Sequence, residues 1–282
     1  MKKLLIILFS IVSADLAVAQ SSEGGGVYIL NNGKLINSIV KGNYASNGFG
    51  VAGTTGEVLN CNILDNLYLN KEIMIPGDMY LGDGTVYSPE YDSNGNLLAI
   101  PDSIKSLVMG VCFWSNTNND FINAQFWILS VEESSKKMAW GPLSDVTDLY
   151  NYQAAELILY DVDGKTNTAS IVNHYGSAAT TANCAAKYCI EYGTPATKGE
   201  WFLPSGGQMR EVLRSLSVIN EVLAELGRTT VSTNAGYWVS NEFSQSNGWS
   251  QETSNGINVT SSNSTKSSLL KVRPMIIVTR SN

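Results

Sequence analysis

The chain has few charged residues and hardly any histidine. Only 15% of its 282 residues are Asp, Glu, Lys or Arg, the formal net charge is −7, and His174 is the single histidine. Its Lys and Arg residues do not cluster, which argues against nucleic acid as a partner, because phosphate backbones are bound through concentrated positive charge. The 44% of apolar residues argues equally against a disordered chain.

Patterns for catalysis and metal binding are also scarce. His174 has no Ser, Cys or Asp motif nearby, so a nucleophilic triad has no support. The glycines at 24–26 and 206–207 fit turns and a helix start rather than a phosphate loop. Asp161-Val-Asp163-Gly164 resembles part of a calcium loop but lacks the later acidic ligands, so a turn is the preferred interpretation. We expect no catalytic residue, no metal and no cofactor.

The chain has four cysteines and neither a C-x-x-C motif nor a Cys/His cluster, so a zinc site is not expected. Cys184 and Cys189 lie on one predicted helix, a poor geometry for bridging each other. Buried free thiols are the favoured interpretation for all four, Cys61 and Cys112 included. A Cys112–Cys184 disulfide is the alternative, because an exported protein can hold one.

A hydrophobic run stands close to the start of the sequence. A basic Met1-Lys2-Lys3, an apolar run over Leu4–Val12 and the Ala17-Val18-Ala19 site predict a secretory signal peptide over 1–19. No later segment reaches the length of a membrane-spanning helix. We therefore expect an exported protein, located at the cell surface, outside the cell or in the periplasm, with no membrane span.

Residues 20–66 contain an internal repeat. The segment 33–43 aligns with 56–66 at an offset of 23 residues, and Gly26-Val27 matches Gly50-Val51 at an offset of 24. Short strands separated by Gly/Asn turns at a constant period resemble rungs of a right-handed parallel β-helix. Two rungs need another surface to bury their core, so this segment must lean on the rest of the chain, pair with another chain or be partly ordered. The alternative is a polar leader with two hairpins.

Residues 67–106 are expected to form connecting hairpins. Asp83-Gly84 lies between the strand-like segments 79–81 and 85–87, a two-residue hairpin signal. After it, the nearly unbroken apolar runs 107–114 and 126–131 predict central strands that are buried on both faces.

A helix is predicted to begin at Ser205, which stands three residues ahead of Gln208, the spacing of a capping box. A second helical piece over 218–226 should end at Gly227. Further helix is expected at 170–172 and 178–192. The first helix has four apolar residues at one-face spacing: Met209, Val212, Leu213 and Leu216.

The order of motifs in the second half of the chain resembles a known module. Trp201-Phe-Leu-Pro-Ser205 precedes the helix, Tyr237-Trp-x-Ser-x-Glu242 and Gly248-Trp249 follow it, and Lys271-Val-Arg-Pro274 comes last. This order is similar to the C-type-lectin-like C-terminal module of exported bacterial proteins, the Lcl C-terminal-domain type, over about 79–278. The resemblance implies an α+β fold for 107–282, with two main helices and a mixed, mostly antiparallel sheet.

In that fold the first and last strands of the module pair. The resemblance therefore places 107–114 beside 271–278. Pro274 has no N–H to donate, so one side of the last strand should be an edge or a bulge there.

The functional sites known on this fold are not carried by the sequence. Calcium-dependent lectins use Glu-Pro-Asn or Gln-Pro-Asp with Trp-Asn-Asp, and none of these occurs here. The related formylglycine-generating sulfatase-modifying enzymes carry Arg-Leu-Pro-Thr-Glu-x-Glu-Trp and reactive cysteines near the C-terminus. This chain has Trp201-Phe-Leu-Pro-Ser-Gly-Gly-Gln208, and no cysteine follows Cys189. We therefore expect a protein that is not an enzyme.

A polar segment with a few aromatic residues remains as the candidate site. Residues 241–264 are rich in Asn, Ser, Thr and Gln, the composition of adaptable binding loops, and the resemblance places them in an exposed loop region. Phe243 and Trp249 are the expected exposed anchors, with Trp238 in the core; the alternative is a solvated hairpin with both tryptophans buried. The predicted ligand-binding residues are Asn241, Phe243, Gln245, Asn247, Trp249, Gln251, Asn255 and Asn258.

The sequence thus predicts an exported, non-catalytic ligand-binding or adhesion protein for a surface glycan or protein. One alternative is a structural subunit of a surface assembly, whose residues 24–66 stack on a copy of the chain or on a partner. The other is an enzyme of the sulfatase-modifying-factor fold.

Overall fold

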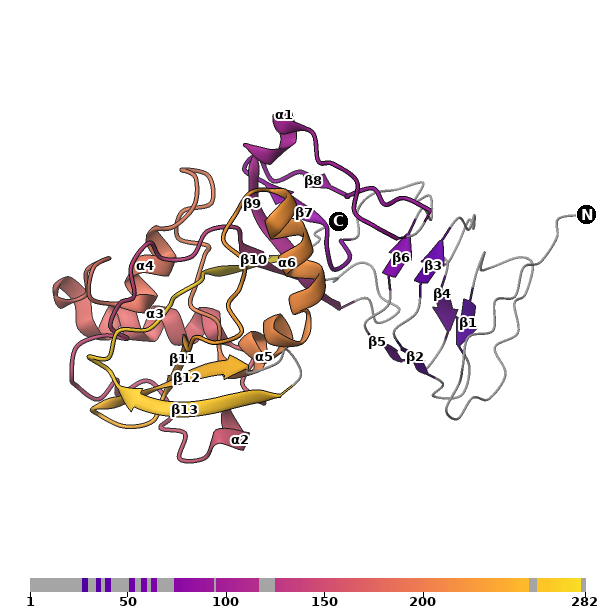
Figure 1. Cartoon of the computed structure of the whole chain (residues 1–282). Helices are drawn as coiled ribbons and strands as arrows, with labels where there is room; N and C mark the ends of the chain where they lie inside the picture. The colour runs from indigo at the N-terminus through magenta and orange to yellow at the C-terminus, as the bar shows by residue number, and fades with distance from the viewer. Residues whose placement is uncertain are drawn as a thin grey trace, which may run out of the picture. The chain divides into compact units, whose positions relative to one another are not determined.

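A computed structural model of the chain describes short strands between 27 and 64, and then residues 74–93, 95–116, 125–253 and 258–279 (Figure 1). They belong to two compact units, one made of 1–71 with 90–96 and the other of 72–89 with 97–282. The predicted signal peptide at 1–19 lies outside the described residues.

Three parallel strand pairs are described in the first unit, which also includes 90–93 and 95–96. Their registers match Val27 with Val51, Lys34 with Glu57 and Ile39 with Asn62, so the strands pair at the 24- and 23-residue offsets of the sequence repeat. Successive turns of a solenoid pair at the repeat period in this way. The alternative of two hairpins does not fit these strands, because their pairing is parallel. The β-helix classification itself stays a prediction. The pairs are β1 (Val27–Ile29) with β4 (Val51–Gly53), β2 (Lys34–Ile36) with β5 (Glu57–Leu59), and β3 (Ile39–Lys41) with β6 (Asn62–Leu64).

A five-stranded antiparallel sheet organises one half of the second unit, in the order β14-β10-β9-β7-β8. The predicted Asp83-Gly84 hairpin joins β7 to β8, with Gly84 at a φ of 88°. The two apolar runs of the sequence lie in the interior of the sheet. The strands are β7 (Met79–Leu81), β8 (Val86–Tyr87), β9 (Val108–Asn116), β10 (Gln125–Ser130) and β14 (Met275–Thr279).

The predicted pairing of the first and last strands is wrong as stated. Ile276 of β14 pairs with Ile128 of β10, and β10 lies between β14 and β9. A strand that is buried on both faces needs a neighbouring strand on each side. For β9 and β10 one of these neighbours is the other strand of the pair, which is close in the sequence. β14 is the outer strand of this sheet and begins directly after Pro274, but its other side is paired at the next residue, because Met275 and Phe202 exchange two backbone hydrogen bonds.

A second sheet has three antiparallel strands, β11 (Tyr237–Glu242), β12 (Asn247–Thr253) and β13 (Val259–Thr265), in that order. Most of 241–264 therefore lies in strands and not in a loop, and the expected exposure is wrong for the end of β11 and most of β12, whereas β13 is half-buried or exposed along its length. Every residue of β11 is buried, because this strand lies against helices on one side and has β12 at its edge.

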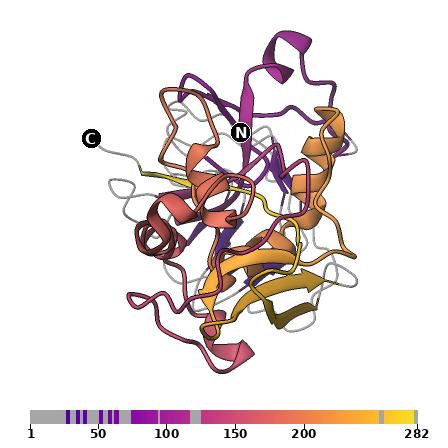
Figure 2. The same ribbon diagram turned by 90° about the vertical axis from the view of Figure 1, so that its left-hand side faces the viewer.

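Six α-helices are described, and the α+β class is confirmed, but two main helices are too few (Figures 1 and 2). The third helix begins well before residue 170, because Asp163 Oδ1 accepts the N–H of Thr166 and caps it. Its buried residues include small and polar ones, which hides the helical period from the sequence. The helices are α1 (Asp102–Lys105), α2 (Ala155–Ile158), α3 (Gly164–Tyr175), α4 (Ala185–Glu191), α5 (Gly206–Arg214) and α6 (Leu216–Glu225).

The helix predicted after Ser205 is α5, and its capping box is formed, with Gln208 Oε1 3.0 Å from the Ser205 nitrogen. The predicted apolar stripe is buried along its whole length. The next helix, α6, ends at Glu225, and Gly227, two residues later, has a φ of 67°. Contacts of α5 with β11 and β12, and of α6 with β9, link the two sheets through one core.

Three of the four cysteines are buried free thiols, namely Cys112, Cys184 and Cys189. The favoured interpretation is confirmed for them, and the Cys112–Cys184 disulfide is wrong. The side chain of Cys61 lies outside the described residues. Burial raises the pKa of all three described thiols, which keeps them protonated and unreactive.

Candidate functional site

A loop ahead of α2 lies along the β11–β12 hairpin and forms a small aromatic surface with it. Tyr152 N donates to the carbonyl of Glu242 at 3.0 Å, and Gln153 Nε2 donates to the carbonyl of Phe243 at 2.8 Å. In return, Trp249 Nε1 donates to the carbonyl of Tyr152 at 2.9 Å. These bonds hold segments that are about a hundred residues apart in the sequence, so the surface is a property of the folded unit.

The rings of this surface are arranged edge to face. Tyr150 and Tyr152 have centroids 4.8 Å apart, and Phe243 and Trp249 have centroids 5.5 Å apart. Tyr150 is 67% exposed, whereas Trp249 is only 3% exposed and supports Phe243 from below. We call Tyr150, Tyr152 and Phe243 the aromatic face. Aromatic rings that are held in place by a buried neighbour offer contact area at a low cost in conformational entropy.

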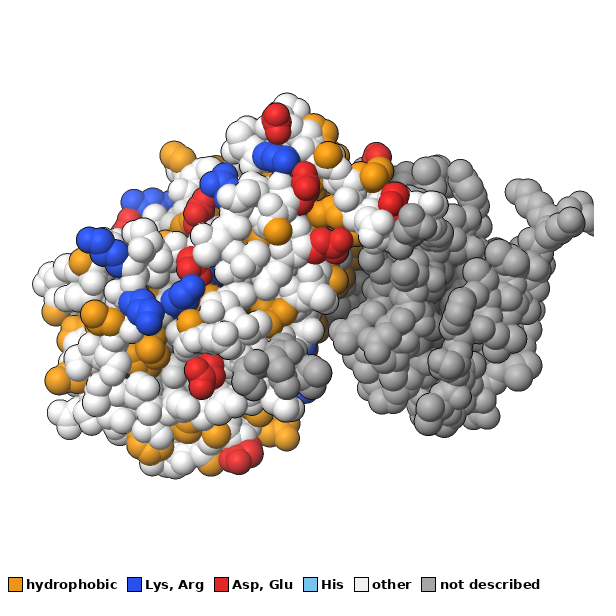
Figure 3. Space-filling view, viewed as in Figure 1, with side chains coloured by type: hydrophobic (Ala, Val, Ile, Leu, Met, Phe, Trp, Pro, Cys, Tyr) orange, Lys and Arg blue, Asp and Glu red, His pale blue; other side chains and the backbone are white. Residues whose placement is uncertain are grey.

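Amide and carboxyl groups lie around the aromatic face. Asn151 Nδ2 donates to Asp145 Oδ1 at 3.0 Å, and Asn247 Nδ2 donates to Asn263 Oδ1 at 3.1 Å. Gln245 is exposed at the tip of the hairpin. Figure 3 shows that the surface over β12, β13 and α2 in this view is mostly uncharged, with hydrophobic groups among polar ones. The chemistry offered is hydrogen bonding beside aromatic rings, without a strong field of either sign.

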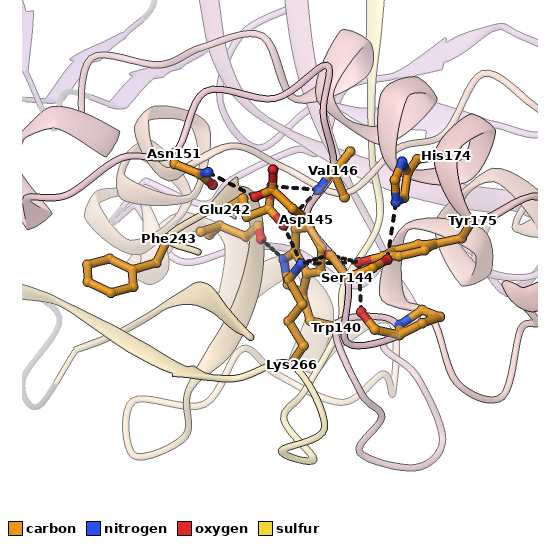
Figure 4. Close-up of polar contacts among 12 residues, drawn as sticks. Trp140, Ser144, Asp145, Val146, Asn151, His174, Tyr175, Glu242, Phe243 and Lys266 are labelled. Atoms are coloured by element: carbon orange, nitrogen blue, oxygen red, sulfur yellow. Dashed lines mark hydrogen bonds and ion pairs between the residues drawn. The ribbon is translucent and has the colours of Figure 1, made fainter. Parts of the chain in front are cut away.

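A buried ion pair lies next to Phe243 (Figure 4). Glu242 ends β11 and Lys266 directly follows β13, and both side chains are fully buried. Lys266 Nζ contacts the Glu242 carboxylate, donates to the Ser144 carbonyl at 2.5 Å and lies 4.8 Å from the centre of the Trp140 ring. Glu242 also accepts the N–H of Val146. The pair fixes the end of β11, and with it the neighbouring Phe243.

The electrostatics of these groups follow from burial. Burial raises the pKa of Glu242 and lowers that of Lys266, while their mutual attraction opposes both changes. Burial, and then the nearby carboxylate of Asp161, raise the pKa of Tyr152 to about 12. The Tyr152 hydroxyl therefore stays protonated at physiological pH.

The Asp161 carboxylate accepts hydrogen bonds that hold the surrounding chain in place. Asp161 Oδ2 accepts from Asn167 Nδ2 at 2.8 Å and from Asn241 Nδ2 at 2.6 Å, and Oδ1 accepts the N–H of Asp163 at 2.8 Å. The carboxylate is thus already used as a structural acceptor. Over the described ranges, no group of three or more His, Cys, Asp or Glu residues is placed to hold a metal ion.

Three of the eight predicted ligand-binding residues are buried, which is a correction. Asn241, Trp249 and Gln251 lie inside the unit, each at most 3% exposed. Asn241 Oδ1 accepts the N–H of Gly206 at 2.7 Å, so this side chain holds the start of α5 instead of a ligand. The alternative that buried both Trp238 and Trp249 is the correct one for these rings.

The remaining predicted residues are at or near the surface. Gln245 and Asn258 are exposed, Phe243 and Asn247 are partly exposed, and Asn255 lies outside the described residues. Their role in binding stays a prediction. Sequence reasoning missed Tyr150, Tyr152 and Gln153, although a Tyr-Asn-Tyr-Gln run in a polar loop could have indicated exposed aromatic residues.

Burial of Trp249 leads to a prediction about stability. Trp249→Ala should lower the free energy of unfolding by about 3–5 kcal/mol, because it removes a buried ring and the bond to the Tyr152 carbonyl. Tyr150→Ala is the matched surface control and should change stability by no more than about 0.5 kcal/mol. Urea denaturation followed by fluorescence measures both, and equal midpoints for the two variants would show that Trp249 is not a core residue.

A further hollow of about 460 Å³ lies on the side of β9 in the second unit. Its wall includes Val108, Val131, Tyr188 and Tyr192, and its charged pair Arg228–Glu132 is bonded at 2.5 Å. Because the wall is largely apolar and Arg228 and Glu132 bind each other, the hollow offers few polar groups that could orient a substrate.

Comparison with known proteins gives one informative similarity. No family model matches the chain, and no curated protein matches its sequence. The fold is similar to the crystal structure of a fimbrial protein from Bacteroides ovatus ATCC 8483, with a TM-score of 0.52 and 16% identity. The alignment covers 83% of this chain and 52% of the fimbrial protein, so the chain spans about half of its length. At this identity the similarity concerns the fold alone. The described helices include none long and apolar enough to span a membrane.

Proposed function

We propose that this is an exported, non-catalytic cell-surface binding or adhesion protein, and that the aromatic face of its second unit binds an uncharged glycan. The observation that carries the proposal is the pair of ring contacts, Tyr150 with Tyr152 and Phe243 with Trp249, on two segments that loop–hairpin hydrogen bonds join. Sugar rings present apolar C–H faces and many hydroxyls, and such a surface meets both needs.

The lectin-like classification is part of this proposal. Antiparallel pairing of β10 with β14 joins a strand near the start of the module to its last strand, which supports closure of the kind that the resemblance implies. The capped helix after Pro204-Ser205 supports it as well. The fimbrial protein of similar fold agrees with a role in a surface structure.

Glycan-array binding followed by titration tests the function. Tyr150→Ala combined with Phe243→Ala should weaken binding at least tenfold, about 1.4 kcal/mol, and EDTA should have no effect. Tyr160→Ala is the aromatic control, because Tyr160 is 81% exposed but is not one of the ring pairs of the face. Binding that is unchanged in the double variant, or that EDTA abolishes, contradicts the proposal.

A second candidate function rests on the first unit. Its strands pair two by two at the repeat period, as a short stack does, and such a stack gains stability from further rungs. The candidate is a structural subunit that stacks residues 24–66 on a copy of itself or a partner. Oligomers seen by light scattering should disappear when residues 20–66 are deleted, and oligomers that persist would exclude this route.

A further inference from the structure

The Lys266–Glu242 pair differs from the other ion pairs described in the second unit by its complete burial. Both side chains are 0% exposed, and the amine and carboxyl groups are in direct contact. The partly exposed pair Lys271–Glu133, by comparison, has side chains that are 23% and 12% exposed. A fully desolvated amine held against a carboxyl group is the arrangement in which an amide bond can form.

We propose that Lys266 and Glu242 condense into an isopeptide bond between Nζ and Cδ, which joins the end of β11 to the residue after β13. The two groups come from positions 24 residues apart and bracket the whole of β12. Fixed neighbouring groups react as if at a very high concentration, and a site closed to water favours a reaction that releases water.

Aromatic rings enclose the pair. The Trp140 ring lies 4.8 Å from Lys266 Nζ, and the Tyr175 ring lies 5.9 Å from it. Trp140 is held in place by its Nε1, which donates to the Val239 carbonyl at 2.7 Å. Gly248 makes room for this ring, because a Cβ there would come within 2.8 Å of it. The Lys266 amine is therefore enclosed by two aromatic rings, and Gly248 of the hairpin leaves room for one of them.

The same burial brings both groups toward their reactive forms. Desolvation lowers the pKa of Lys266 and raises that of Glu242, so a proton can pass from Nζ to the carboxylate within their hydrogen bond. When the proton has passed, a neutral amine, which is a nucleophile, faces a protonated carboxyl group, which is an electrophile.

The condensation is balanced without an oxidant, a reductant or a further reactant. The Nζ lone pair attacks Cδ of Glu242, a C–N bond forms and the carbonyl oxygen takes the negative charge. A proton leaves Nζ for the carboxyl hydroxyl, the C–O bond breaks, and one water departs as the carbonyl reforms. The product is a neutral secondary amide.

Backbone groups are placed to assist this step. The N–H of Val146 lies 3.2 Å from each Glu242 oxygen, so it can stabilise the charge that develops on oxygen during the attack. The Ser144 carbonyl at 2.5 Å and the Tyr175 hydroxyl at 3.2 Å hold Nζ in position. Lys266 N donates to the Ser246 carbonyl at 2.8 Å, which anchors the reacting residue to the hairpin.

Intact mass of the denatured full chain tests the proposal. The wild-type protein should be lighter than its sequence requires, for the N-terminus found, by the mass of one water. Protease digestion should release a branched peptide that joins the segments carrying Glu242 and Lys266. Full mass with two separate peptides would overturn the proposal and leave an ordinary ion pair, and this wild-type measurement decides the matter even if variants fold poorly.

Variants add an internal check. Lys266→Arg should show its full mass, because a guanidinium does not lose its proton. Glu242→Gln should lose ammonia and give a product of the same mass as the cross-linked wild type. The segments carrying Lys271 and Glu133 serve as the control in the same digest, since this partly exposed pair should stay unlinked. A branched peptide joining those segments would count against burial as the cause.

Discussion

Lys266→Met should be markedly less stable than the double variant Lys266→Met/Glu242→Leu. Removing one member of a buried ion pair leaves the other charge uncompensated and costs about 3–5 kcal/mol, whereas replacing both by apolar residues is often neutral. Glu242 is fully buried, and Lys266 is the only residue among those described that forms an ion pair with it. Urea denaturation of both variants, followed by tryptophan fluorescence, measures the difference. Both lack the amine, so the comparison holds whether or not the wild-type pair is covalently joined.

The pH dependence of the stability of Lys266→Met is a second measure of the cost of the unpaired Glu242 carboxylate. Burial raises the pKa of Glu242, and without Lys266 the main opposing influence is gone. A group with a raised folded pKa contributes stability that is present below its unfolded pKa and is lost as the pH rises through the folded pKa. Lys266→Met should therefore regain stability as the pH falls toward 4.5, the ordinary pKa of a glutamate side chain. Lys165→Met, which breaks an exposed pair with Glu200, is the control and should change little.

Two outcomes would contradict this account of the pair. One is a double variant that is no more stable than Lys266→Met. The other is a single variant whose unfolding midpoint does not rise on acidification relative to the double variant. Either would mean that the Glu242 carboxyl reaches water in the absence of Lys266.

Gly207→Ala should destabilise the protein, although alanine is the better helix former. A Cβ at this position would lie 2.3 Å from the carbonyl oxygen of Asp161 and 2.9 Å from that of Leu159. Backbone oxygens cannot move aside cheaply, so we expect a loss of about 1–3 kcal/mol from overpacking. Helix propensity alone predicts a gain of about 1 kcal/mol, so the sign of the change separates the two effects.

Thermal unfolding of Gly207→Ala and of a control glycine measures this. Gly236→Ala is the control, because the nearest atoms to its new Cβ are those of Leu270 at 3.7 Å, an ordinary contact. Its melting temperature should stay close to that of the wild type. A rise in the melting temperature of Gly207→Ala would show that the loop at 159–161 does not press on α5.

The same packing accounts for the two neighbouring glycines at the start of α5. Gly206 and Gly207 stand at the start of α5, where the backbone of 158–161 passes too close for any side chain. Their nitrogens are used as well, Gly206 N bonding to Asn241 Oδ1 and Gly207 N to the Asp161 carbonyl. The two glycines are therefore required for close packing against 158–161. In the sequence they indicated only the start of a helix.

Signals that act within a few residues or at a constant period determined much of this protein before any tertiary contact was considered. The capping box at Ser205, the Asp83-Gly84 hairpin and the strand register of the repeat are all found where the sequence indicates them. Each depends on hydrogen bonds or side-chain spacing that neighbouring residues specify themselves, or on one repeat stacking on the next.

Only the tertiary structure decided which polar residues lie inside and which strands are neighbours. Asn241 and Glu242 are buried because Gly206 and Lys266, residues distant in sequence, complete their hydrogen bonds and charge. In the sequence alone such residues are indistinguishable from those of an exposed loop. The placement of β10 between β9 and β14 is decided in the same way, since two apolar strands can pair in more than one order and only the assembled core selects one.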